Sequence, residues 1–372
     1  MAKGSGGKAS GSMDEMTKEL SKFSGRITKS KEGHEHAEPR KEEPPLCLVT
    51  GAGGRLGRYL VEAMLSIGWR VRVLHREFES QQQYPEGVQI VYGDLTKKAS
   101  LEPAVQDVDY IYHLAALVSH SAPINDLLEV NYRGTQNLID VSRTRAYTLK
   151  RFIYVSTISV YGKSMERLPA DEETPLNPSD GYARSKRMAE GVVMQYSDKM
   201  PVVILRPAVI YGKSFDEAYL PVLAALERGK MPIIGSGDNT IPFIHATDVV
   251  RALLLAATSD RAQGNIYVIA PRERRTQREI LELASKHLGV NPPRRRMPLW
   301  RVKLGLKIGR LLSIITRKRP KLLEEHLDTM AADRYFDTSK AEKELGFKPI
   351  VKLDDGMKEM VEYYKAGIGG AR

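Results

Sequence analysis

The chain contains little of what usually cross-links or anchors a protein. Its 372 residues include a single cysteine, Cys47, which excludes an internal disulfide framework and is typical of a reducing compartment. No apolar run approaches the roughly 18 residues that a membrane-spanning helix needs, so no spanning segment is predicted. A signal-peptide apolar stretch is also missing. These absences predict a cytoplasmic protein.

Residues 1–44 have few large apolar side chains and are rich in Gly, Ser, Lys and Glu. Such a composition cannot support a packed core, so this segment is predicted to be a disordered polar tail. Its acids, among them Asp14, Glu15 and Glu35, are not typical of a transit peptide. The apolar content of 42% is enough for one large core or two domains after this tail.

Acidic residues are missing from one long stretch. Between Asn291 and Lys321 there are eleven Lys or Arg residues and no Asp or Glu, which equals the whole net charge of +11. Apolar residues such as Trp300 are interleaved with these charges, as in a basic amphipathic helix. Residues 294–321 therefore have three interpretations: packing on the core, peripheral contact with an anionic membrane surface, or binding of an anionic substrate. Nucleic acid is not predicted as a partner, because aromatic base platforms are missing.

What the chain does have is a glycine-rich turn between an apolar strand and a helix. Residues 46–50 are short, apolar and β-prone, Gly51, Gly54 and Gly57 recur at every third position, and residues 59–65 continue with helical periodicity. Glycine permits positive φ, close approach to a pyrophosphate, and tight packing of the helix on the strand. The turn predicts dinucleotide binding at a helix N-terminus, with a plain glycine-rich loop as the alternative.

The next strand bears on the choice of cofactor. Residues 69–74 are predicted to form it, and it ends at His75 and Arg76. A free ribose 2′-hydroxyl usually meets an acid near this point, whereas a 2′-phosphate requires a cation. Because neither residue is acidic, NADP(H) is favoured over NAD(H), with a solvated arginine at a strand end as the alternative.

Two further strands are predicted to complete this half of the sheet. Residues 88–92 lead to Asp94, which is expected near the adenine, and residues 109–116 end in small side chains that allow close approach to the cofactor. His113 lies on the second of these strands. No other histidine or cysteine has metal-site spacing to it, so it is interpreted as a hydrogen-bonded core residue, and no metal site is predicted.

Tyr182 and Lys186 form the candidate catalytic pair. Their spacing of four places them on one face of a helix. A phenol with a pKa of about 10 is a poor base at neutral pH, but a nearby ammonium favours the phenolate. Lys186 is therefore expected to lower the pKa of Tyr182 and to reach the ribose hydroxyls. Tyr182 then exchanges a proton with a substrate oxygen while hydride moves to or from a nicotinamide.

The order of elements predicts an α/β architecture. Alternating strands and helices from about 45 to 207 predict a Rossmann-type, doubly wound parallel sheet, with 202–207 as a late strand. The NAD(P)-binding domain built on this sheet is predicted to span 45–270. Residues 218–230 are predicted to be helical and 239–244 to form a short strand. Residues 210–242 are predicted to contribute to the substrate cleft. Residues 271–366 are predicted to form a smaller, mainly helical substrate domain. The cleft between the two parts is the expected site.

Eight patterns in order resemble the extended short-chain dehydrogenase/reductases, nearest to the 3β-hydroxysteroid dehydrogenase and dihydroflavonol reductase branch. The patterns lie at 50–57, 93–95, 130–135, 155–162, 182–186, 205–207, 243–249 and 335–347. The resemblance implies that Thr157 hydrogen-bonds the substrate oxygen, with Ser156 as its rival, and that Asn131 supports the lysine; an exposed or helix-capping asparagine is the alternative. It also implies a homodimer.

The predicted catalytic residues are thus Tyr182, Lys186, Thr157 and Asn131. The residues predicted to bind the cofactor are Gly51, Gly54, Arg55, Leu56, Gly57, Arg76, Asp94, Leu95, Leu114, Ala115, Ala116, Tyr182, Lys186 and Pro207.

The reaction itself is predicted from the two residues directly after Thr157. Sugar-nucleotide dehydratases of this family have Asp-Glu at these positions, but this chain has Ile158 and Ser159, which disfavours dehydration. The prediction is an oxidoreductase that interconverts a secondary hydroxyl and a ketone on an apolar or lipid-like small molecule. A sugar-nucleotide epimerase is the first alternative, and a non-catalytic dinucleotide-binding sensor or scaffold is the second.

Overall fold

The fold is built on one central sheet of seven parallel strands. The computed structural model describes residues 43–77, 83–119, 122–163, 165–305 and 331–367. From one edge to the other, the strands are β10 (Asn265–Ile269), β6 (Val202–Pro207), β5 (Arg151–Val155), β4 (Tyr110–His113), β1 (Leu46–Thr50), β2 (Arg70–His75) and β3 (Gln89–Tyr92). This order and the parallel pairing confirm the predicted doubly wound Rossmann-type sheet.

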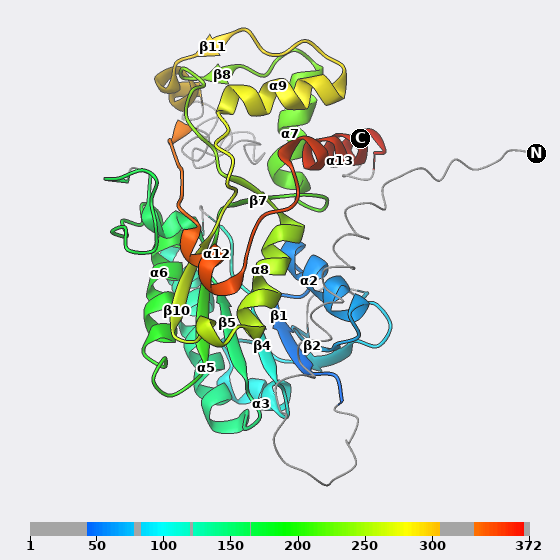
Figure 1. Ribbon diagram of the computed structural model, residues 1–372, viewed down its shortest axis with the longest axis vertical. Helices are drawn as coiled ribbons and strands as arrows, with labels where there is room; N and C mark the ends of the chain where they lie inside the picture. Colours follow the sequence, from blue (N-terminus) through cyan, green and yellow to red (C-terminus); the bar gives the residue numbers. More distant parts are fainter. Residues whose placement is uncertain (1–42, 78–82, 120–121, 164, 306–330, 368–372) are drawn as a thin grey trace, which may run out of the picture.

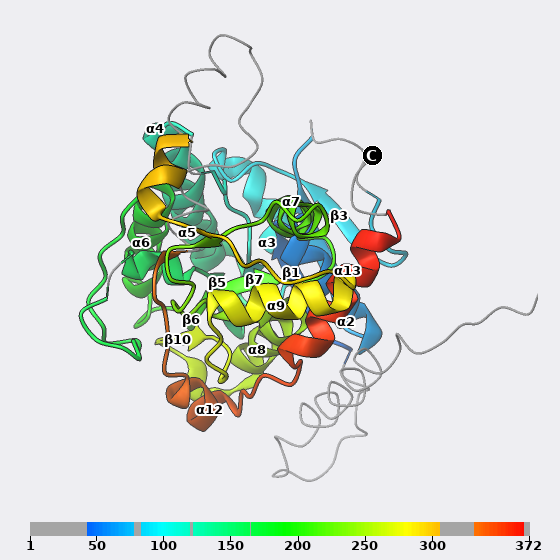
Figure 2. The same cartoon turned by 90° about the horizontal axis from the view of Figure 1, so that it is seen from above.

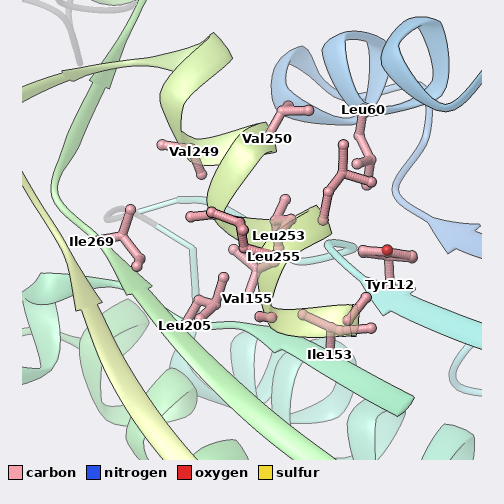
Figure 3. Packing of buried hydrophobic residues seen from close by; sticks show 14 of the residues in the cluster. Leu60, Tyr112, Ile153, Val155, Leu205, Val249, Val250, Leu253, Leu255 and Ile269 are labelled. Atoms are coloured by element: carbon pink, nitrogen blue, oxygen red, sulfur yellow. The ribbon is translucent and has the colours of Figure 1, made fainter. Parts of the chain in front are cut away.

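Helices cover both faces of the sheet (Figure 1). On one face lie α2 (Arg55–Ser66), α8 (Ala246–Thr258) and α12 (Ser339–Leu345), and on the other lie α3 (Glu102–Val105), α5 (Gly134–Arg145) and α6 (Gly181–Met194). Figure 3 shows the first face, where Leu60 from α2 and Leu253 from α8 approach Tyr112 and Leu205 on the strands. The central strands are buried on both sides, which explains their nearly continuous apolar sequences.

A smaller group of elements lies above the carboxyl end of the sheet in Figure 1, and Figure 2 looks down onto it. Its helices α7 (Asp216–Glu227), α9 (Gln277–Leu288) and α13 (Leu353–Lys365) pack around a separate apolar cluster that includes Leu223, Ile280 and Val361. A capping box of Thr276 and Glu279 begins α9. Two short parallel pairs complete the group: β7 (Val209–Tyr211) with β9 (Phe243–His245), and β8 (Ile233–Ile234) with β11 (Arg296–Met297).

Packing crosses the predicted domain boundary in both directions. Helix α7, from the segment assigned to the Rossmann domain, contacts α9 and α13. Conversely, Phe336, Leu345 and Phe347 lie in the same buried cluster as the sheet. The division at 270/271 stays a prediction. The remaining short elements are η1 (Lys98–Leu101), α4 (Ile124–Leu127), η2 (Leu128–Arg133), η3 (Ile158–Tyr161) and η4 (Asp260–Ala262).

Two sequence predictions fall largely outside the described residues. The predicted tail is represented only by residues 43 and 44, where Glu43 pairs with Arg70 at 2.7 Å. The basic stretch 294–321 is described only as far as residue 305. Among the described residues, no helix is both long and apolar enough to cross a bilayer.

Candidate functional site

The predicted site residues lie along the carboxyl end of the sheet, where the parallel strands finish. Thr50 pairs in register with Leu74 and His113, and His113 pairs with Tyr154, so the carboxyl ends of these parallel strands form one row. The chain leaves β1 toward β2 on one side, while β4 lies on the other side, which makes this edge the topological switch point of the sheet. The segments that follow the strands carry the predicted residues at 51–57, 76, 94–95, 114–116 and 156–157, and Pro207 ends β6.

The glycine turn is shaped by backbone contacts that leave no room for side chains. Gly51 has φ +71°, and a Cβ there would lie 2.7 Å from the Ala115 nitrogen; at Gly57 it would lie 2.2 Å from the Gly51 oxygen. Gly54 caps α2 without a side-chain hydrogen bond, and the first turn of α2 has no acid. The start of α2, with its positive dipole end, therefore suits an anion, which fits a dinucleotide pyrophosphate.

The two predicted side chains at the start of α2 face different ways. Leu56 packs against the buried cluster of the sheet. The Arg55 guanidinium lies 6.0 Å from the centroid of the Phe215 ring, which comes from the segment before α7. Arg55 therefore extends from the glycine turn toward the second group of elements.

Asp94 and Arg76 lie at the end of the row where the adenosine is predicted. Asp94 Oδ1 accepts hydrogen bonds from the Thr96 N–H at 2.9 Å and from its hydroxyl at 2.8 Å. Burial alone would raise the pKa of Asp94, but these bonds and the charge of Arg76 hold it below its usual value. Leu95, next to Asp94, is buried. Asp94 and Arg76 are thus close enough to interact, and their roles toward the adenosine and a 2′-phosphate stay predictions.

A chain of hydrogen bonds joins the glycine turn to the middle of the site. His113 Nδ1 lies 2.7 Å from the Thr50 hydroxyl, and Nε2 lies 2.8 Å from the Thr135 hydroxyl. Thr135 donates to the Asn131 carbonyl, and the Ala115 N–H donates to Thr50 Oγ1. Every group is satisfied if His113 is neutral with its proton on Nε2. Burial, and then Lys186, lowers the pKa of His113 to about 3, so the interpretation as a core residue is confirmed.

Asn131 is a buried connector rather than an exposed or capping asparagine. It lies in the π-helical turn η2 and is 1% exposed. Its side chain accepts from the Leu117 N–H at 2.7 Å and donates to the Leu117 carbonyl and to the Ser185 hydroxyl. Since Ser185 precedes Lys186, Asn131 joins the segment after β4 to helix α6. Its predicted support of the lysine through backbone and water contacts stays a prediction.

Lys186 is held deep in the site by β5. Asp180 caps α6 by accepting from the Ala183 N–H at 2.8 Å. One turn into the helix, the Lys186 ammonium donates to the Val155 carbonyl at 2.6 Å and lies 4.2 Å from the centroid of the Tyr154 ring. Its side chain is 2% exposed, and this burial lowers the pKa of Lys186 to about 7.

The expectation that Lys186 lowers the pKa of Tyr182 differs from what the structure shows. Burial, and then the charge of Asp180, raises the pKa of Tyr182 above its ordinary value. The physical reason is that burial and the neighbouring Asp180 carboxylate both disfavour the phenolate. Both causes favour the protonated phenol, and the acid/base role of Tyr182 stays a prediction.

Thr157 and Ser156 have different surroundings. Thr157 is half-buried; its hydroxyl oxygen accepts from the Ser159 N–H at 3.1 Å and caps η3, and its proton is directed to Ser159 Oγ at 3.2 Å. Ser156 is buried, and its hydroxyl has no partner among the described residues. Thr157 is thus the more accessible hydroxyl, and its role toward a substrate stays a prediction.

A buried ion pair that the sequence patterns do not predict lies beneath the site. Arg206 on β6 makes a two-pronged contact with Glu190 on α6, with both N···O distances 2.9 Å, and donates to the Tyr161 hydroxyl at 2.8 Å. The arginine and glutamate side chains are 3% and 1% exposed. One sequence feature could have indicated this pair. Arg206 is a charge inside an apolar strand, so it requires a buried partner. Glu190 is a candidate for that partner because it follows Lys186 by one helical turn.

The chain is similar to known proteins over most of its length. It is 29% identical to human short-chain dehydrogenase/reductase family 42E member 1, covering 88% of this chain and 89% of the relative. It is 27% identical to human sterol-4-alpha-carboxylate 3-dehydrogenase, decarboxylating, over 86% and 88%. It is 26% identical to 2-alkyl-3-oxoalkanoate reductase of Shewanella oneidensis, over 84% and 85%.

Solved structures agree on the fold. A dTDP-glucose 4,6-dehydratase from Streptomyces venezuelae with bound NAD superposes with a TM-score of 0.69 at 26% identity, covering 87% of this chain and 98% of that one. The sequence model of the NAD dependent epimerase/dehydratase family matches residues 47–270. Together with the glycine turn and the Tyr182–Lys186 helix, these similarities identify an NAD(P)-dependent enzyme of the extended short-chain dehydrogenase type. The chain belongs to the NAD dependent epimerase/dehydratase family.

Proposed function

We propose that the enzyme interconverts a secondary hydroxyl and a ketone, with Tyr182 as the acid/base and NADP(H) as the preferred cofactor. The observation that carries the proposal is the location of Tyr182 and a buried Lys186 on one helix at the switch-point edge, beside the glycine turn. A raised pKa keeps Tyr182 protonated at neutral pH. The ketone-reducing direction is therefore the one that this state of the site favours.

The chain's own residues supply binding and proton transfer. The start of α2 holds the pyrophosphate, and Asp94 and Arg76 hold the adenosine end. A bound nicotinamide supplies the hydride in the reducing direction and accepts it in the other. The Tyr182 hydroxyl gives its proton to the carbonyl oxygen, Thr157 hydrogen-bonds that oxygen, and Lys186 uses ammonium protons not directed to Val155 to orient the ribose.

The names of two relatives favour an apolar substrate, and one side chain disfavours dehydration. The relatives are named as a sterol-carboxylate dehydrogenase and a 2-alkyl-3-oxoalkanoate reductase, and both names describe compounds with a large hydrocarbon part. Ile158, directly after Thr157, is 2% exposed and belongs to the core. This position therefore supplies no carboxylate for water elimination, and for this reason the proposal does not include a dehydration reaction.

A substrate comparison tests the proposed reaction. We expect the purified enzyme to oxidise NADPH with 3-oxosteroids or 2-alkyl-3-oxo acids, followed by absorbance loss and by mass spectrometry of the alcohol. UDP-glucose serves as the comparison substrate. If the enzyme converts it to its 4-epimer without net cofactor turnover, and reduces none of the ketones, the epimerase alternative replaces the oxidoreductase.

The cofactor preference makes a separate prediction at Arg76. Replacing Arg76 with alanine is expected to weaken NADPH binding by about tenfold or more, because a charge-assisted hydrogen bond is lost, and to leave NADH nearly unchanged. Isothermal titration of both cofactors measures this. Arg70→Ala is the matched control, since Arg70 begins β2 and pairs with Glu43 and Pro44 at the end of the strand opposite to Arg76. Equal affinities in the wild type would contradict the assignment.

We also propose peripheral membrane contact through the basic stretch. In its described part, Trp300 and Leu304 lie one helical turn apart and are 61% and 50% exposed, while Arg301 between them is also exposed. Apolar side chains flanked by cations without acids suit the surface of an anionic bilayer.

Vesicle sedimentation tests this contact. The wild type is expected to bind phosphatidylserine-containing vesicles, and the double variant Trp300→Ala/Leu304→Ala to bind about tenfold more weakly. Tyr147→Ala is the control, because Tyr147 is 85% exposed but lies elsewhere. Two outcomes would argue against the contact. One is that the double variant sediments with the vesicles as well as the wild type does, and the other is that the wild type sediments equally with and without anionic lipid.

The expected homodimer is retained as a further proposal, supported by the family alone. Light scattering during size-exclusion chromatography measures the mass directly. Twice the mass of one chain is expected, and a monomer across the working concentration range would contradict it.

A further inference from the structure

We infer that Tyr154 is a positioning residue for the reaction: its ring face holds the ammonium of Lys186 in place and in its charged form. The inference rests on the proposed function, since it assigns Lys186 a role there. Tyr154 lies on β5, the strand that leads into Ser156 and Thr157, and is fully buried. It makes no contact with substrate in this scheme and acts only through the lysine.

The geometry carries the inference. Lys186 Nζ lies 4.2 Å from the Tyr154 ring centroid, well inside the roughly 6 Å range over which an ammonium is attracted to a ring face. The same ammonium donates to the carbonyl of the next residue, Val155, at 2.6 Å. Two consecutive residues of one strand thus hold the charge, one through its ring and one through its backbone. This attraction is strongest where water is excluded, and Lys186 is 2% exposed.

The tyrosine hydroxyl does not explain why an aromatic residue stands here. Among the described residues, Tyr154 Oη has no hydrogen-bond partner of good geometry although it is buried. The neighbouring Thr135 hydroxyl donates instead to the Asn131 carbonyl. A buried hydroxyl without a partner destabilises the protein, so the hydroxyl is not what makes an aromatic side chain useful at this position. The ring face toward Lys186 is the part of Tyr154 with a defined interaction.

Other titratable groups near Lys186 set the background for its charge. Glu190 on the same helix raises the pKa of Lys186 but is itself neutralised by Arg206 from β6. His113 from β4 is neutral because its own pKa is lowered to about 3. Tyr182, on the lysine's own helix, is protonated at neutral pH. The ring and the Val155 carbonyl are therefore the direct contacts that favour the ammonium, against a burial that disfavours it.

The inference predicts how the Lys186 pKa responds to the ring. Tyr154→Leu is expected to lower it by about one unit, whereas Tyr154→Phe, which keeps the ring, changes it by less than about 0.3. If the leucine variant does not fold, stepwise fluorination of a phenylalanine at position 154 weakens the ring quadrupole with little change of shape. The pKa should then fall with each fluorine. Nitrogen-labelled lysine NMR, assigned with Lys186→Met, reads the titration without any cofactor.

The catalytic readout has a definite sign. The ammonium is lost as pH rises through the Lys186 pKa, so the alkaline limb of ketone reduction should move to lower pH in Tyr154→Leu by the same amount and stay in Tyr154→Phe. The inference is overturned if the Lys186 pKa does not change when the ring is removed or fluorinated. It is also overturned if the Lys186 pKa shifts but the alkaline limb of ketone reduction does not. If the wild type reduces no ketone, the proposed function fails, and the titration alone then decides whether Tyr154 holds the charge.

Discussion

Tyr182→Phe is expected to lower ketone reduction by about 100- to 10,000-fold, the usual contribution of one general acid. The phenylalanine keeps the ring packed at the start of α6 but has no proton to give to the carbonyl oxygen. Dinucleotide affinity should stay within about twofold, because the pyrophosphate contacts come from α2 and not from this side chain. Steady-state turnover with NADPH, together with titration of cofactor binding, measures both quantities.

The control for this variant is Tyr147→Phe, which removes the same hydroxyl from a residue that is 85% exposed and lies before β5, at the end of that strand opposite to Ser156 and Thr157. It should leave turnover unchanged. If Tyr182→Phe retains full activity in cells, the sensor or scaffold alternative gains support, since such a protein needs the cofactor but no acid. Lost turnover with intact cofactor binding excludes that alternative.

Glu190→Gln is expected to lower the free energy of unfolding by about 3–5 kcal/mol, the cost of leaving a buried charge without its partner. Arg206 would keep its hydrogen bond to Tyr161 but lose the carboxylate that now receives two of its N–H groups. Urea titration followed by circular dichroism measures the change. The double variant Glu190→Leu/Arg206→Met removes both charges and should recover most of the loss.

A surface pair of the same kind provides the comparison. Lys358 and Glu362 are 4.0 Å apart, and both side chains are 63% exposed. Glu362→Gln should change the free energy of unfolding by less than about 0.5 kcal/mol, because water and salt screen such pairs. If the two glutamine variants are equally stable, the Arg206–Glu190 contact is not the buried pair described above.

The strands of the sheet could be predicted closely because their sequences are buried on both faces. Residues 46–50 and 202–207 form β1 and β6 with the predicted bounds, since a continuous apolar run ends where the chain reaches the polar edge. The predicted strand at 239–244 is shorter and lies outside the main sheet, paired with β7. Its pairing depends on a partner about 35 residues earlier, which local sequence does not specify.

The candidate site divides in a similar way. The glycine turn and the Tyr182–Lys186 spacing are local patterns, and the structure brings both to one edge. The direction of the Tyr182 pKa shift could not be predicted, because it depends on how much water reaches the phenol. The contact of Asn131 with Ser185 joins residues 54 positions apart, so only the folded chain reveals it.

The buried Cys47 can be used to detect opening of the central sheet, because its thiol is protected in the folded enzyme. It is the only thiol in the chain, it lies in the central strand β1, and it is 0% exposed. Burial also raises its pKa well above the usual value, so little reactive thiolate forms. A thiol reagent can therefore label the native protein only when the middle of the sheet separates. Conversely, a cysteine introduced at any exposed position would accept a probe alone, without removal of the natural residue.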